Sequence, residues 1–135
     1  MADWASGNIL LSGKRSNLIQ FLLNGLIPLG NSIEIRNSNS KFEMKTPNGE
    51  YLIMDSDRHY LSCDNITMDH QKSQMLECPF SAAFEIDMQL LESISKHYNI
   101  DITIRVNTPS DYIQKVNIVK GEVIQDDLIC PCEIA

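Results

Sequence analysis

The spacing of apolar residues in the last third of the chain predicts one helix followed by three strands. Over Glu85–Tyr98 the apolar positions recur every three or four residues, which places one stripe on a helix. That stripe consists of Ile86, Leu90, Leu91 and Ile94. Apolar and polar residues then alternate over Ile100–Val106 and again over Ile113–Val119, as in half-buried strands. The pair Lys120-Gly121 predicts a tight turn into a short strand at Val123.

The N-terminal third predicts a strand and then a helix. Residues Asn8–Ser12 alternate around two apolar positions, and Gly13 closes this strand. Ser16 is the expected N-cap of a helix that Pro28 and Gly30 end. Its apolar face is Leu18, Ile19, Leu22, Leu23 and Leu26. We expect Leu22 and Leu23 of this helix, with Leu90 and Ile94 of the second helix, to be buried against a sheet.

The middle of the chain, residues 31–80, predicts short strands joined by turns. The expected strands are Ile33–Arg36, Glu50–Met54, Tyr60–Cys63, Ile66–Met68 and Met75–Cys78. Polar runs and the turn Pro47-Asn48-Gly49 separate them. Two helices around antiparallel strands predict a ferredoxin-like α+β sandwich with both helices packed on one face. The 135 residues suit one domain, expected over residues 1–129, with a short C-terminal tail over 130–135.

The net charge of −7 bears on the kind of partner. Eighteen acidic residues against eleven basic ones disfavour a grip on nucleic acid, which depends on neutralising phosphates. An acidic surface favours basic protein partners, although acidity also serves solubility alone. Apolar runs fall short of the roughly 20 residues that span a bilayer, and an acid, Asp3, stands where a secretory signal carries a base. These features predict a cytoplasmic protein without a membrane partner.

Aromatic residues offer no clear nucleic-acid surface. Base stacking on a sheet needs exposed aromatic side chains near Lys and Arg. Tyr51, Tyr60 and Phe42 fall in expected strands, but none of them lies in an aromatic-rich strand flanked by basic residues. Trp4 is expected as an anchor in the core.

Cysteine and histidine are the candidates for local chemistry. Cys63, Cys78, Cys130, Cys132, His59 and His70 supply enough thiolate and imidazole for a zinc site. The Cys130-Pro131-Cys132 pair nevertheless lacks a second ligand pair at zinc spacing, so we expect no metal and no cofactor. Buried free thiols are the alternative. His97 is expected to complement the dipole at the end of the second helix.

Two segments resemble a known family. They are Asp3-Trp4-Ala5-Ser6-Gly7-Asn8 with the following Ile9–Gly13, and Ser81-Ala82-Ala83-Phe84 with the helix and strands up to Gly121-Glu122-Val123. Both resemble the two ends of the YubB-type ferredoxin-like proteins of plasmids and phages, while the middle of the chain does not. That family usually carries Cys where Ala5 stands. The resemblance implies a ferredoxin-like fold and an origin in a mobile element.

Two classes of function follow from these features. The first is a non-enzymatic phage or mobile-element protein that binds and inhibits a host protein, such as an anti-defence inhibitor of the anti-CRISPR type. Its expected contact residues, which bind a basic surface, are Asp55, Asp57, Asp126 and Asp127. The second is a small enzyme or nucleic-acid-handling factor whose site forms only in three dimensions. A concave pocket lined by His59, Asp55 and Cys63 would favour the second class, and a convex acidic face the first.

Overall fold

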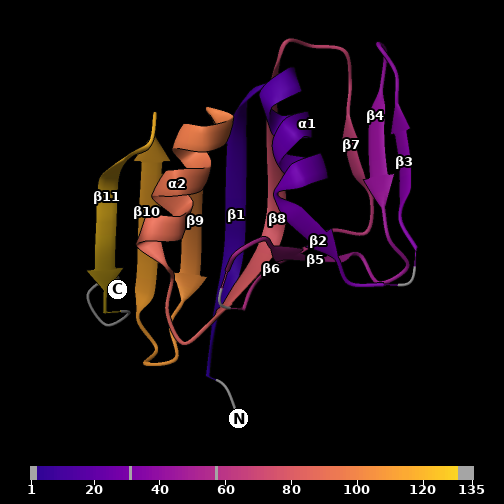
Figure 1. Ribbon diagram of the computed structural model, residues 1–135. Coiled ribbons are helices and arrows are strands. Elements are labelled where there is room, and N and C mark those ends of the chain that lie inside the picture. Colours follow the sequence, from indigo (N-terminus) through magenta and orange to yellow (C-terminus); the bar gives the residue numbers. More distant parts are fainter. Residues whose placement is uncertain (1–2, 31, 57, 131–135) are drawn as a thin grey trace.

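The computed structural model describes residues 3–30, 32–56 and 58–130, and its largest feature is an eight-stranded antiparallel sheet (Figure 1). Its strand order is β11-β10-β9-β1-β8-β6-β5-β2. In that order the strands are Glu122–Ile129, Ile113–Val119, Asp101–Asn107, Trp4–Lys14, Ser73–Ala83, His59–Ser62, Glu50–Ile53 and Leu26–Pro28. The sheet therefore begins with the last described strand and ends with the second.

The centre of the sheet is the pair of 11-residue strands β1 and β8. They pair antiparallel along their whole length, from Trp4 opposite Ala83 to Lys14 opposite Ser73. On its other side β1 pairs with β9. The two backbones approach so closely at Gly7 that a Cβ atom there would overlap the carbonyl oxygen of β9 opposite it. Strands β1 and β8 are both longer than the strands that the apolar spacing predicts there, Asn8–Ser12 and Met75–Cys78.

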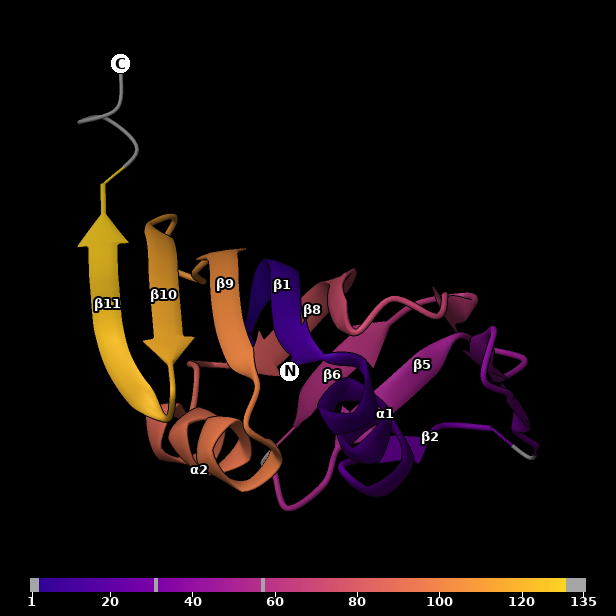
Figure 2. The same ribbon diagram turned by 90° about the horizontal axis from the view of Figure 1, so that it is seen from above.

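Two helices, α1 (Arg15–Asn24) and α2 (Met88–Tyr98), cover the same face of this sheet (Figure 2). The expected burial is confirmed for Leu22 and Ile94. Leu23, however, is 36% exposed and Leu90 is half-buried, whereas Leu91 is fully buried. The stripe of α2 that faces the sheet is therefore centred one residue later than expected.

Polar contacts fix both ends of α2. The side chain of Asp87 caps the N-terminus by accepting a hydrogen bond from the Leu90 N–H at 3.1 Å. Near the other end Ser95 is fully buried; its hydroxyl donates to the Ile100 carbonyl at 2.7 Å and accepts the Gly121 N–H at 2.9 Å. This hydroxyl joins α2 to β9 and to the β10–β11 turn. His97 lies in the last turn of α2, as expected.

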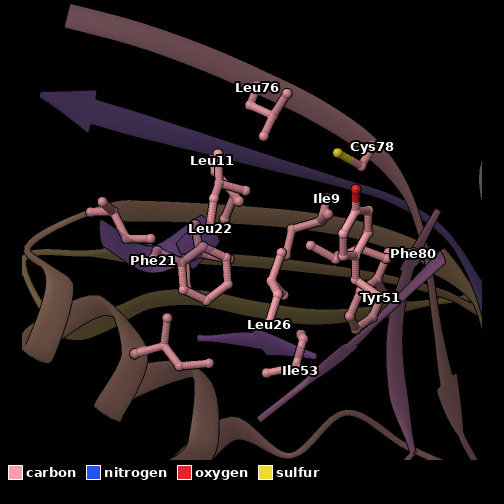
Figure 3. Close-up of a cluster of buried hydrophobic side chains, with 14 of the residues drawn as sticks. Ile9, Leu11, Phe21, Leu22, Leu26, Tyr51, Ile53, Leu76, Cys78 and Phe80 are labelled. Atoms are coloured by element: carbon pink, nitrogen blue, oxygen red, sulfur yellow. The ribbon is translucent and has the colours of Figure 1, made fainter. Parts of the chain in front are cut away.

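A second sheet of three strands lies beyond β2, the last strand of the large sheet (Figure 1). Its strands in order are β3 (Glu34–Asn37), β4 (Phe42–Lys45) and β7 (Ile66–Met68). Phe42 and Met44 of β4 belong to the same continuous core as the residues under the large sheet. Figure 3 shows part of this core, where Tyr51 lies with its hydroxyl toward Cys78.

The expected ferredoxin-like sandwich is wrong. Strands hold 52% and helices 17% of the described residues, in sheets of eight and three strands. A ferredoxin-like domain has the order βαββαβ, with four strands, whereas here the described residues form seven strands (β2–β8) between α1 and α2. The middle strands β2, β5 and β6 extend the large sheet, and β3, β4 and β7 form the other.

The predicted tight turn at Lys120-Gly121 is confirmed. Both residues have positive φ, 52° and 77°, as two-residue hairpin turns require. The strand that follows is longer than expected, since β11 spans eight residues. None of the described helices is long and apolar enough to cross a membrane.

Candidate functional site

The structure separates the acidic residues that the sequence singles out. Asp55 follows β5 with a φ of 63° and lines a hollow of about 300 Å³ between α1 and α2, beside His97. Asp126 and Asp127 lie within strand β11, not in a turn. Asp57 lies outside the described residues. Asp55 and Asp126 line different hollows that share no lining residue.

A hollow of the described surface lies between the start of α2, the β9–β10 loop and strand β11. It has a volume of about 650 Å³, and we name it the β11 hollow. Its lining residues are Asp3, Phe84, Glu85, Ile86, Met88, Thr108, Pro109, Ser110, Tyr112, Gln114, Asp126 and Leu128. These residues come from four segments of the chain, so the hollow exists only in the folded protein.

The turn before α2 places an aromatic ring at the hollow. Phe84 has a φ of 69°, in the left-handed region that residues other than glycine rarely adopt. Its N–H donates to the Asp3 carbonyl at 2.7 Å, which holds this backbone against the start of β1. The Phe84 side chain is 58% exposed. A large apolar ring therefore stands at the surface on a turn whose backbone is fixed by a hydrogen bond.

The β9–β10 loop supplies the second aromatic ring. The Thr108 N–H donates to the Tyr112 carbonyl at 2.7 Å, and the Tyr112 N–H donates back to the Thr108 hydroxyl at 3.1 Å. The Asp111 N–H also donates to the Thr108 carbonyl at 3.0 Å. These three bonds close the loop on itself. They hold the partly exposed Tyr112 at the hollow.

Strand register decides which side chains of β11 face the hollow. Val116 of β10 is buried under the helices, and Asp126 lies directly opposite it, so Asp126 is on the helix side. Leu128, opposite Gln114, lies on the same side and is 59% exposed. Gln114 donates to the Asp126 carboxylate at 3.0 Å.

Asp127 lies on the opposite face of the sheet. Directly across from it on β10 is Lys115, whose positive charge opposes its own. Two adjacent aspartates of one strand therefore have different surroundings. Only Asp126 belongs to the β11 hollow.

The charges around the β11 hollow have one sign. Among the described residues that line it, Asp3, Glu85 and Asp126 carry carboxylates, and none is a Lys, Arg or His. Exposed apolar surface from Phe84 and Leu128 lies beside these carboxylates. Such a surface complements a group that combines an apolar stem with a positive end.

The pocket of His59, Asp55 and Cys63 that would favour an enzyme or nucleic-acid-handling factor is not found among the described hollows. His59 is buried, and its Nε2 accepts the Asp87 N–H at 2.9 Å, so it ties β6 to the cap of α2. It lines a hollow at the start of α2 that does not include Asp55. The hydrogen bond between His59 and Asp87 therefore stabilises the fold.

The two central cysteines lie near each other. Continuing the β6–β8 register, in which His59 opposes Ala82, places Cys63 opposite Cys78. Burial, and secondarily the neighbouring Cys63, raises the pKa of the Cys78 thiol to about 12. A thiol with so high a pKa stays protonated at neutral pH and is a poor nucleophile.

The cysteines and histidines do not converge on a metal site in the described part of the chain. Cys130 follows the edge strand β11, and Cys78 lies on β8, four strand spacings or about 19 Å away across the sheet. Within residues 3–30, 32–56 and 58–130 no group of three His, Cys, Asp or Glu side chains is placed to hold an ion. Cys132 lies outside the described residues.

The aromatic residues of the expected strands are mostly unavailable for base stacking. Tyr51 and Phe42 are fully buried. Trp4, expected in the core, is instead 37% exposed on the sheet face away from the helices, beside Tyr60, with the Arg58 guanidinium over its ring. The rings available at the β11 hollow are surrounded by carboxylates, which repel phosphates.

The chain matches no protein-family model, no curated protein and no solved structure. The resemblance of its two ends to YubB-type proteins is neither supported nor contradicted by these comparisons. It stays a prediction, together with the mobile-element origin that it implies.

Asp126 of the β11 hollow is a contact residue that the sequence predicts, whereas the apolar part of the hollow was not predicted. A signal was present in the last strand, where Leu128 stands two residues after Asp126 and so shares its face. Phe84 and Tyr112 gave no comparable signal, because each stands in a turn whose position relative to β11 depends on the whole sheet.

Proposed function

We propose that this protein is a non-enzymatic binding protein that recognises a basic, partly apolar segment of another protein at the β11 hollow. One observation carries the proposal: the β11 hollow combines exposed apolar side chains with three carboxylates and, among its described lining, no cation. A Lys or Arg side chain has an apolar stem and a cationic end, so it fits both parts of this lining.

The charge of the whole chain acts in the same direction. A net charge of −7 attracts a basic partner over distance and raises the association rate at low salt. The apolar surface of Phe84 and Leu128 then provides contact area that salt does not screen. Binding should therefore weaken with salt without disappearing.

The partner is expected to be a host protein, in the cytoplasm, and the narrowest form of the proposal is an anti-defence inhibitor. That form rests on the resemblance to mobile-element proteins and on acidity. The hollow itself supports only the recognition of a basic protein segment.

The experiment uses a fluorescein-labelled peptide of alternating Lys and Val, with an alternating Glu and Val peptide as the comparison. We expect the Lys peptide to bind and the Glu peptide not to bind. Asp126→Asn should weaken the affinity for the Lys peptide about two- to five-fold, the range of one exposed ion pair. Asp127→Asn is the matched control, since it removes the same charge on the other face. Equal binding of both peptides, or equal effects of the two substitutions, would refute recognition at the β11 hollow.

A further inference from the structure

We propose that the partner segment is an extended strand that pairs with β11 and becomes the ninth strand of the large sheet. This inference rests on the proposed function, because it specifies how the basic segment reaches the β11 hollow. The incoming strand lies along the edge of the sheet. Its side chains on the helix side enter the hollow.

The two ends of the large sheet differ in their capacity to pair. Strand β11 is eight residues long, pairs with β10 on one side, and has no partner among the described strands on the other. Alternate residues of such an edge direct their N–H and C=O groups outward, where another chain can bond them. At the other end β2 has three residues and finishes at Pro28, which lacks an N–H. The described sheet thus has one long open edge.

Charge argues against a second copy of this chain as the occupant. Two copies of β11 paired antiparallel about the acidic part of the strand would place Asp126 or Asp127 opposite the same residue of the other copy. Like charges directly opposite each other destabilise a strand pair. A strand carrying Lys or Arg at these positions gains from the same arrangement.

The side chains of β11 specify an order of residues in the incoming strand. An antiparallel strand passes Ile129 and Leu128 first and then Asp127 and Asp126. It should therefore carry two apolar residues followed by two basic residues. The residue opposite Asp126 places its positive end in the hollow, and the residue opposite Leu128 adds to the apolar surface beside Phe84.

The basic residue opposite Asp127 gains less, because Lys115 already lies across from that carboxylate on β10. This difference between the two faces makes the residue opposite Asp126 the more discriminating position. A parallel strand would require the reverse order, two basic residues and then two apolar ones.

The test uses the whole chain labelled with ¹⁵N and the peptide acetyl-Ser-Val-Val-Lys-Lys-Thr-amide. Amide hydrogen exchange is measured with and without the peptide. At about 90% saturation we expect alternate amides of β11 to exchange about ten-fold more slowly, since exchange then occurs only from the free fraction. A peptide with Glu for both Lys should give no protection. A peptide N-methylated at alternate residues keeps its side chains but loses the N–H groups along one of its two edges. Of the two possible methylation patterns, the one that removes the N–H groups facing β11 should bind without protecting β11.

The outcomes separate the two proposals. Shifts at Phe84 and Tyr112 without slower exchange in β11 would overturn strand addition and leave recognition at the hollow intact. Equal binding of the Glu peptide, or no binding of either peptide, would overturn both. Slow exchange of all β11 amides in the free protein together with a doubled mass in light scattering would show that a second copy occupies the edge, against the charge argument.

Discussion

Substitution of Leu91 tests the packing of α2 because its neighbour Leu90 provides a matched control. Both are leucines in the same helix, but Leu91 is fully buried and Leu90 is half-buried at the hollow between the helices. Leu91→Ala removes three buried carbons, worth about 2.4 kcal/mol at about 0.8 kcal/mol each. The closed cavity left behind raises the expected cost to about 3–4 kcal/mol. At Leu90 the gap opens to solvent, so we expect about 1 kcal/mol.

The assay is urea unfolding followed by far-UV circular dichroism, with the m-value required to stay constant so that midpoints report stability. For a chain of this size the losses correspond to falls in Tm of about 10 °C for Leu91→Ala and about 3 °C for Leu90→Ala. The apolar spacing alone predicts a buried Leu90. Equal losses, or a greater loss at Leu90, would refute the helix orientation described here.

Three further predictions concern single residues. Ser95→Ala should lower the free energy of unfolding by about 2–4 kcal/mol, because it leaves the buried Ile100 carbonyl and the buried Gly121 N–H without their hydrogen bonds to the hydroxyl. The control Ser93→Ala, on the exposed side of α2, should lower it by less than about 0.5 kcal/mol. Equal midpoints of the two variants in urea would contradict this prediction. Gly7→Ala should cost at least about 3 kcal/mol through overlap with β9, against a small effect of Ser6→Ala, measured by thermal unfolding. Burial raises the pKa of Cys78 from 9.0 to about 12, so its stabilising effect is complete below pH 9 and is lost as the pH rises toward 12. The unfolding free energy should fall by up to about 1.4 kcal/mol per pH unit above pH 9, and an equally steep fall in Cys78→Ala would contradict the assignment.

The helices and the last hairpin could be predicted from the sequence because their signals are local. The apolar stripe of α2, the alternation in β9 and β10, and the pair Lys120-Gly121 depend only on residues close in the chain. The N-cap of α1 was predicted wrongly, since α1 begins directly after β1 with Lys14 at the cap and without a capping side chain. The β1 strand continues through Gly13, which looks like a terminator in the sequence.

Strand β8 continues past Pro79, whereas the predicted strand Met75–Cys78 ends directly before this proline. Proline lacks an N–H and rarely stands in a central strand. Here the paired residues of β6 and β8 end at Leu61 opposite Phe80, one position before Pro79, whereas on the β1 side Pro79 pairs with Asn8. The sequence does not reveal where a neighbouring strand ends, and this information is long-range. The same applies to the β11 hollow, whose lining comes from separate segments between Asp3 and Leu128.

The position of β1 has a consequence for how the chain acquires its structure. Both neighbours of β1 come late: β8 starts at residue 73 and β9 at residue 101. During synthesis, β1 emerges first but must wait until some 70 further residues have been made before its first partner exists. The search for these distant pairings is slow, because the chain loses the entropy of closing a long loop before any contact between the strands offsets that loss. Until then both hydrogen-bonding edges of β1 remain unpaired and its apolar side chains stay exposed, so a nascent chain of this protein should depend on chaperones that shield extended segments.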